Sequence, residues 1–187
     1  NARNNTTMMP VQRIVRLAAV GPDSNVVEIG GGTGTLTAAL AAAGARVVVY
    51  EIDAGLVRVL HHTVGDLPSV EIRHADAGDA DLDLDLGPGP WSMVSNLPYN
   101  IGTGIVLDAL RGAPRVDRFV LLVQREVAER LLAGPGSPAY GLPSVITSLH
   151  AHGSMAFSVA PTVFYPAPSV ASAVIELDAS EDDAFAS

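Results

Sequence analysis

The stretch "VVEIGGGTGTLTAALAAAGARVVVYEID" (residues 26–53) predicts a strand, a glycine-rich turn, a helix and a second strand in direct succession. It opens with an apolar run, residues 26–30, that ends in glycine, as a short buried strand does. Residues 35–44 are rich in alanine and leucine and stop at Gly44, which is typical of a helix with a glycine C-cap. Residues 45–53 are rich in β-branched side chains and predict the second strand.

The segments that follow continue this alternation. We expect strands at residues 70–76, 91–96 and 118–124, helices at residues 54–64, 101–112 and 125–134 (the last closed by Gly134), and a loop at residues 77–90. Residues 143–152 fit a helix or a strand, and the alternating segments 154–161 and 170–178 are expected to pair antiparallel. This order implies an α/β fold with a mostly parallel sheet, helices on both faces and a C-terminal antiparallel hairpin. Ligands bind in such sheets beyond the carboxyl ends of the strands, so the residues there are the candidates for a site.

The composition is that of a globular chain. Of its 187 residues, 48% are hydrophobic and 17% are charged, and none is cysteine, which excludes disulfides and fits a reducing, cytoplasmic compartment. No apolar run reaches the ~20 residues of a membrane-spanning helix. We expect one domain over residues 1–178 and a frayed acidic tail over residues 179–187. The net charge of −9 argues against a large polyanionic partner, unless the few arginines cluster or a basic segment lies outside this chain.

The turn after the first predicted strand contains Gly30, Gly32 and Gly34 in the spacing G-x-G-x-G. Glycines allow the backbone to turn tightly and to approach a ligand closely, and the helix that follows offers unpaired N–H groups. A dinucleotide fingerprint would place its last glycine where this chain has Thr35, so NAD and FAD are weaker matches. A tight turn without a ligand is the alternative.

Acidic residues follow the second and third predicted strands. Glu51 lies about 20 residues after Gly30, where nucleotide-binding sheets place an acid on the ribose hydroxyls. Asp76 is placed to accept a hydrogen bond from an adenine amino group. Either acid alone would also suit a helix N-cap, but the glycine turn and the two acids follow three consecutive strands and together indicate a nucleoside. S-adenosylmethionine fits best, because the turn has no phosphate-binding lysine and an acidic site tolerates a sulfonium cation.

The fourth predicted strand ends in "NLPY", residues 96–99. The exocyclic nitrogen of adenine is a poor nucleophile, because its lone pair is delocalised into the ring. Oxygens that accept its N–H groups make the nitrogen pyramidal, and the side chain of Asn96 with the carbonyl of Leu97 or Pro98 could supply them. Proline would hold this backbone rigid, and Tyr99 could stack on the base. Positioning the amine in line with the methyl–sulfur bond would supply much of the rate acceleration.

Taken together, these motifs resemble the adenine-N6 ribosomal RNA dimethyltransferase family, and within it the small-subunit dimethyladenosine transferases. The stretches that carry the resemblance run from about residue 11 to residue 178 and read "VVEIGGGTGTLT", "VVYEID", "HADA", "VSNLPYNIGTGIV", "LLVQREVAERLLAGPGSPAYGLPSV" and "APTVFYPAPSVASAVIEL". The last two favour the small-subunit branch over the large-subunit resistance methyltransferases. The resemblance implies a Rossmann-like, seven-stranded class I methyltransferase sheet and a monomer that dimethylates adenine N6 in 16S rRNA during ribosome maturation.

The resemblance also implies roles for particular residues. The expected cofactor-binding residues are Gly30, Gly32, Gly34, Glu51, Ile52, Asp76, Ala77 and Asn96. The expected catalytic residues are Asn96, Leu97, Pro98, Tyr99 and Phe164. Phe164 would pack on the far face of the target base or, alternatively, plug the space between two strands. Arg125 and Arg130 would meet RNA phosphates or, alternatively, form a solvated helix face.

Three features depart from the family pattern. The N-terminal "ARNNTTMMP" replaces a Gln-Asn-Phe-Leu-like run that closes over the cofactor, and Gly31 replaces a proline of the glycine turn. The family adds a small basic helical domain at about the point where this sequence stops, after "DDAFAS", and we expect this chain to lack it, which would account for the acidic balance and weaken RNA binding.

Other functions remain open on the same fold. One is a large-subunit rRNA or small-molecule N-methyltransferase, and another is a non-catalytic ribosome-assembly factor that keeps the cofactor pocket. A metal is not expected, because His150 and His152 form an H-x-H pair without a third ligand and the acidic run at residues 79–87 lacks the spacing of a calcium loop.

Overall fold

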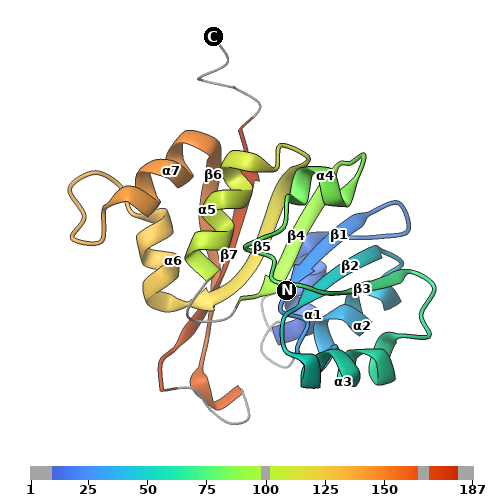
Figure 1. The fold of residues 1–187 in the computed structure, drawn as a ribbon. Helices are drawn as coiled ribbons and strands as arrows, with labels where there is room; N and C mark the ends of the chain where they lie inside the picture. Colours follow the sequence, from blue (N-terminus) through green and yellow to red (C-terminus); the bar gives the residue numbers. More distant parts are fainter. Residues whose placement is uncertain (1–9, 98–101, 164–168, 181–187) are drawn as a thin grey trace.

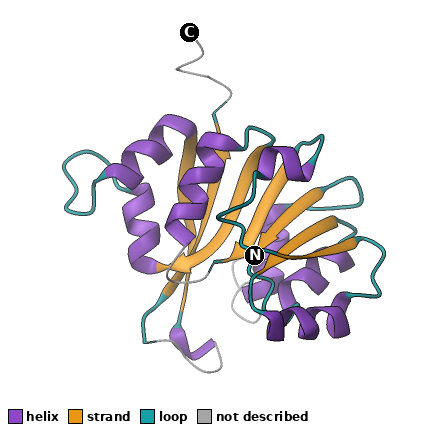
Figure 2. Cartoon of the chain, in the orientation of Figure 1, coloured by secondary structure: helices purple, strands orange, loops and turns teal. Residues whose placement is uncertain are grey.

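The computed structural model describes residues 10–97, 102–163 and 169–180, which form a single sheet covered by helices on both faces (Figures 1 and 2). The strands are β1 (Asn25–Ile29), β2 (Arg46–Glu51), β3 (Val70–His74), β4 (Trp91–Asn96), β5 (Val116–Gln124), β6 (Ala151–Val159) and β7 (Ser172–Ala179). The helices are α1 (Pro10–Ala18), α2 (Thr35–Ala42), α3 (Ala54–Val64), α4 (Leu82–Leu86), α5 (Gly102–Gly112), α6 (Arg125–Leu132) and α7 (Leu142–His150), with a 3-10 turn at Pro161–Val163.

The seven strands lie in the order β3-β2-β1-β4-β5-β7-β6. Every pair from β3 to β5 is parallel, whereas β7 runs antiparallel to both of its neighbours, β5 and β6. The expected fold class is therefore confirmed, including the antiparallel hairpin that β6 and β7 form. From β1 the chain first adds β2 and β3 on one side and then β4 and β5 on the other, so β1 is the topological switch point of the sheet. A ligand is expected beside the carboxyl ends of β1, β2 and β4.

Helices on both faces explain why the central strands are apolar without alternation. In β2 every residue after Arg46 is buried, because α4–α7 share one core with the sheet and α1, α2 and α3 pack on its other face. A strand buried on both sides needs apolar residues at consecutive positions, and "VVVY" supplies them.

Local chemistry ends α2 as expected. Gly44 has a φ of 101°, a left-handed conformation that favours glycine. The N–H groups of Gly44 and Ala45 donate to the carbonyls of Ala41 and Leu40 at 2.9 and 3.3 Å, which is the pattern of a Schellman C-cap. This cap directs the chain straight into β2.

Several expected boundaries are wrong. Residues 77–90 are not all loop, because Leu82 and Leu86 lie one helical turn apart and are both buried, and Asp81 caps the resulting helix α4 by accepting from the N–H of Leu84. Helix α6 ends at Leu132 rather than at Gly134, since Ala133 is already extended. The ambiguous segment 143–152 is a helix up to His150 and a strand from Ala151 onward.

Candidate active site

The carboxyl ends of β1, β2 and β3 enclose a pocket of about 220 Å³. It is lined by Ile29, Gly30, Gly32, Tyr50, Glu51, Ile52, Leu56, Ala75, Asp76, Ala77 and Ile105. Six of the eight expected cofactor-binding residues belong to this lining, namely Gly30, Gly32, Glu51, Ile52, Asp76 and Ala77. The structure thus brings together residues that lie up to 47 positions apart in the sequence (77 minus 30).

The glycine turn takes the backbone around the end of β1. Gly30, Gly32 and Gly34 all have positive φ angles, of 76°, 56° and 82°. A Cβ on Gly32 would meet no atom within 4 Å, so this glycine faces open space beside the pocket. A Cβ on Gly34 would lie 3.3 Å from Leu60 of α3, and Gly34 does not line the pocket. Packing against α3 therefore accounts for Gly34, whereas Gly32 leaves room for a ligand to approach the backbone.

Glu51 is held at the wall of the pocket by two backbone donors. Its Oε2 accepts from the N–H of Gly32 at 2.9 Å and its Oε1 accepts from the N–H of Asp53 at 3.0 Å. Asp53, rather than Glu51, caps α3 by accepting from the N–H groups of Gly55 and Leu56. A carboxylate has roughly four lone-pair sites, so Glu51 keeps acceptor capacity for the two hydroxyls of a ribose.

Three further residues line the pocket, namely Ile52, Asp76 and Ala77. Asp76 Oδ1 accepts from the N–H of Gly78 at 2.9 Å, which fixes the turn after β3 and leaves its Oδ2 as an acceptor. Ile52 is 58% exposed although it is a large apolar residue, and it offers a flat apolar contact to a planar ring. Ala77 is buried beside them.

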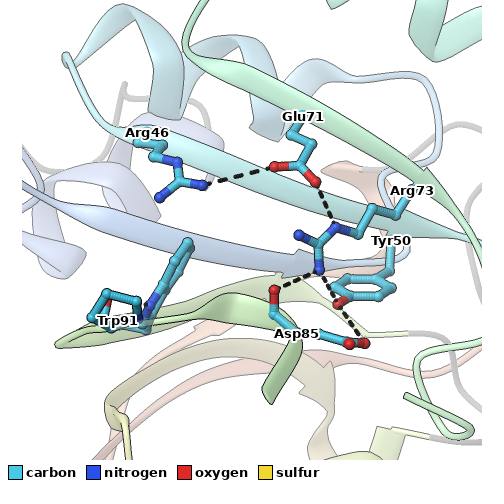
Figure 3. Close-up of polar contacts among 7 residues, drawn as sticks. Arg46, Tyr50, Glu71, Arg73, Asp85 and Trp91 are labelled. Atoms are coloured by element: carbon cyan, nitrogen blue, oxygen red, sulfur yellow. Dashed lines mark hydrogen bonds and ion pairs between the residues drawn. The ribbon is translucent and has the colours of Figure 1, made fainter. Parts of the chain in front are cut away.

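A polar network that the sequence analysis missed supports the pocket (Figure 3). Arg73 Nη1 donates to the hydroxyl of Tyr50 at 2.7 Å and to the carbonyl of Asp85 in α4 at 3.1 Å, and Arg73 Nε donates to Glu71 at 2.8 Å. Burial, the largest cause, raises the pKa of Tyr50. Arg73 therefore links helix α4 to Tyr50 of β2. Tyr50 also lines the pocket, so the network holds one wall of the pocket in place. The available signal was an arginine two residues from a glutamate in one strand, where both side chains share a face.

The ends of β1 and β4 are joined by a side chain. Their ladder pairs Val27 with Met93, and beyond it the hydroxyl of Ser95 accepts from the N–H of Ile29 at 2.8 Å. Asn96 follows at the exposed end of β4, outside the lining of the 220 Å³ pocket. Leu97 is buried, and its N–H donates to the carbonyl of Leu122 at 3.0 Å, which fixes the backbone there. The expected residues Pro98, Tyr99 and Phe164 lie outside the described residues.

Glu28 is an ionisable residue of β1 to which the sequence analysis gave no role. Burial raises its pKa to about 8, against the opposing effect of a 2.7 Å hydrogen bond donated by the hydroxyl of Thr37, and the nearby charge of Glu51 adds to the increase. Burial therefore favours the protonated form of the Glu28 carboxyl. The sequence feature that could have indicated this buried carboxyl is the single acid inside the apolar run "VVEI".

Arg125 and Arg130 are both paired on the surface of α6. Arg125 donates to Glu129 at 2.8 Å and Arg130 donates to Glu126 at 2.5 Å, each over one helical turn. These pairs favour the solvated helix face over phosphate contacts. Within the described ranges, no cluster of three or more His, Cys, Asp or Glu side chains could hold a metal ion, and no helix is long and apolar enough to cross a membrane.

Comparisons with known proteins identify the family. The model of the family described as ribosomal RNA adenine dimethylase matches residues 4–186. The Ribosomal RNA small subunit methyltransferase A of Streptomyces coelicolor is 45% identical over 172 residues, which cover 89% of this chain and 59% of that protein. This chain thus spans about three fifths of the length of that curated relative.

Two solved structures share the fold over nearly the whole chain. The 23S rRNA methyltransferase ErmE superposes with a TM-score of 0.79 at 30% identity, over 92% of this chain and 68% of that one. A dimethyladenosine transferase from Plasmodium falciparum gives a TM-score of 0.78 at 26% identity, over 91% of this chain and 61% of that one. The sheet is that of the class I methyltransferases, and the chain belongs to the ribosomal RNA adenine dimethylase family.

Proposed function

We propose that this chain transfers methyl groups from S-adenosylmethionine to the exocyclic N6 of adenine in small-subunit rRNA, dimethylating it during ribosome maturation. The observation that carries the proposal is the pocket between the glycine turn and Glu51, with Asn96 exposed at the next strand end. The family match and the small-subunit name of the 45%-identical relative support it.

The residues present suit the cofactor. The open side of Gly32 leaves room for the cofactor to approach the backbone of the glycine turn. The free lone pairs of Glu51 suit the ribose hydroxyls, and Asp76 Oδ2 together with the side chain of Ile52 suits the adenine. The carboxylates of Glu51 and Asp76 also favour a cation. When bound, the cofactor supplies an electrophilic methyl group on a sulfonium.

The role of the protein is to position and polarise the amine. Asn96 Oδ1 would accept one N–H of the adenine, and the carbonyl of Leu97, on a backbone fixed to Leu122, could accept the other. These bonds direct the nitrogen lone pair outward at an extruded base. No strong base is required, because the nitrogen loses its proton readily once it is methylated.

The test is incubation of the chain with undermethylated 30S particles and radiolabelled S-adenosylmethionine, followed by nucleoside analysis of the rRNA. We expect labelled N6,N6-dimethyladenosine, and we expect Asn96→Ala to abolish it while the folded fraction stays the same. Asn25→Ala is the matched control, since Asn25 lies at the opposite end of the sheet, where it donates to the carbonyl of Pro90. Full methyl transfer by Asn96→Ala would refute the proposed role.

The likeness to ErmE at 30% identity favours one second candidate, methylation of large-subunit rRNA. The same assay with 50S particles separates the two. Label in 23S rRNA and none in 16S rRNA would establish the second candidate in place of the first.

A further inference from the structure

A second hollow, of about 400 Å³, lies away from the candidate active site, between the end of α6, helix α7 and the start of β6. Its lining includes Leu131, Pro135, Tyr140, Ser144, Thr147 and Ser148. It is built largely by the stretch "LLAGPGSPAYGLPSV", to which the proposed function gives no role.

The loop that borders this hollow is held in place by hydrogen bonds. Ser144 is 1% exposed, and its hydroxyl donates to the carbonyl of Arg130 at 2.5 Å and accepts from the N–H of Gly141 at 3.2 Å. The N–H of Tyr140 donates to the carbonyl of Ser137 at 3.0 Å. The hollow is therefore a formed feature of the fold, which a ligand could enter without ordering the loop first.

The lining has an unusual charge for this protein. None of the residues that line it is acidic, whereas the pocket at the glycine turn and the two hollows beside the segment 75–82 all include carboxylates. In a chain with a net charge of −9, a wall without carboxylates is a place where a polyanion meets less repulsion.

The hollow also offers groups that suit a planar heterocycle. Tyr140 lines it and is 40% exposed, so one part of the ring is free for stacking. Thr147 is 3% exposed, and its Oγ1 is buried without a hydrogen-bond partner among the described residues. That oxygen is closed to the hollow, so the wall it belongs to offers an apolar surface, and the side chains of Leu131 and Pro135 would cover the rest of the ring.

The position of the hollow relates it to the active site. Helix α6 begins at the carboxyl end of β5, where the N–H of Arg125 donates to the carbonyl of Ala171 at 3.0 Å, and the hollow lies at the other end of the same helix. The eight residues of α6 span about 12 Å at 1.5 Å per residue. Strand pairing places the hollow at the amino-terminal edge of β5, because Asp178 pairs with both Arg118 and His152, so the bound strand would have to pass along the length of α6.

We propose that this hollow captures an unstacked nucleobase of the rRNA substrate, at a distance from the target adenine. Tyr140 stacks on the base, and Leu131 and Pro135 pack against it. This inference rests on the proposed function in that it takes rRNA as the substrate.

The test compares Tyr140→Ala, Tyr140→Phe and Thr147→Val in the full chain. Equilibrium binding of undermethylated 30S particles is measured by filter retention, and binding of S-adenosylmethionine is measured by calorimetry. We expect Tyr140→Ala to weaken 30S binding roughly 5- to 150-fold, the range of one lost base–aromatic stack, and Tyr140→Phe to stay within about twofold of the parent. Thr147→Val should also stay within about twofold of the parent, because its Oγ1 is closed to the hollow, and cofactor affinity should not change in any variant.

Leu142→Ala is the matched control, because Leu142 is 70% exposed at the start of α7 and does not line the hollow. Equal 30S binding by the parent and Tyr140→Ala, equal losses in Tyr140→Ala and Leu142→Ala, or no 30S binding by the parent would each overturn the inference. Methyl transfer is scored separately: a parent that binds 30S particles but transfers no methyl group contradicts the proposed function, while the binding series still decides the inference.

Discussion

The Oε2 atom of Glu51 lies 2.9 Å from the backbone nitrogen of Gly32 and accepts its hydrogen bond, which joins the end of β2 to the turn after β1. One carboxylate thus shapes the turn and faces the pocket. A substitution at Glu51 is expected to alter both the conformation of the glycine turn and the binding of a ligand in the pocket. Separate measurements of stability and of ligand binding distinguish the two effects.

Glu51→Gln should weaken binding of S-adenosylmethionine by about 2–3 kcal/mol, roughly 30- to 150-fold, because an amide offers one acceptor oxygen where the carboxylate offers two charged ones. Calorimetry measures the dissociation constant. Glu129→Gln, which changes an exposed acid paired with Arg125, should leave it unchanged. A dissociation constant within twofold of the parent for Glu51→Gln would rule out contact with the ribose.

Glu28→Gln should change how the stability of the chain depends on pH. The pKa of Glu28 is raised from 4.5 to about 8 by burial, so between these pH values the folded chain keeps a proton that the unfolded chain has lost. The contribution of this group therefore falls as the pH rises through that window, by up to about 1.4 kcal/mol per pH unit. The glutamine variant lacks this decline.

Urea denaturation of both proteins at several pH values between 5 and 8 measures the effect as the difference in unfolding free energy. That difference should move steadily in favour of Glu28→Gln as the pH rises. Two parallel stability profiles would show that Glu28 does not bind its proton more tightly in the folded state.

Gly31→Ala should destabilise the chain by about 1–3 kcal/mol, since a Cβ there would lie 2.5 Å from Val49 and 2.9 Å from Leu60, which pack between the turn and α3. Gly104→Ala is the control, because Gly104 is an exposed residue of α5 with no atom within 4 Å of an added Cβ. It should be neutral or stabilise by up to about 1 kcal/mol. Thermal unfolding measures the melting temperatures of both variants. Equal melting temperatures would show that a Cβ at residue 31 is accommodated as easily as one at residue 104.

Arg73→Ala should raise the Michaelis constant for S-adenosylmethionine and leave the turnover number at saturating cofactor close to that of the parent. The reason is that Arg73 holds α4 and Tyr50 beside the pocket without lining it. Tyr50→Phe, which removes one acceptor, should show a smaller change of the same kind. Arg58→Ala, on the exposed surface of α3, should show none, and a lower turnover number in Arg73→Ala would indicate a different role.

The parts of the fold that follow from short-range rules were predictable from the sequence. The glycine cap after α2 depends on Gly44 and the few residues before it, and the parallel pairing of β1 to β5 follows once strands and helices alternate. Glu51 and Asp76 were identified because strand ends in such sheets converge.

Features that depend on distant contacts were not predictable in the same way. Helix α4 was missed because alternation of Asp and Leu at residues 81–86 resembles a polar loop, and only packing of Leu82 and Leu86 against the core shows it to be a helix. The proton on Glu28 and the contact of Arg73 with Tyr50 depend on burial and on pairing between strands, which a linear sequence does not display.

The position of β7 has a consequence for the order in which the protein forms during synthesis. This strand is the last of the sheet along the chain, yet it lies between β5 and β6, and β6 has no other described neighbour. Until residues 172–179 have left the ribosomal tunnel, β5 carries an open edge and β6 has nothing to pair with. Both strands therefore keep unpaired edges during synthesis, and completion of the sheet is a late event of the protein's biogenesis.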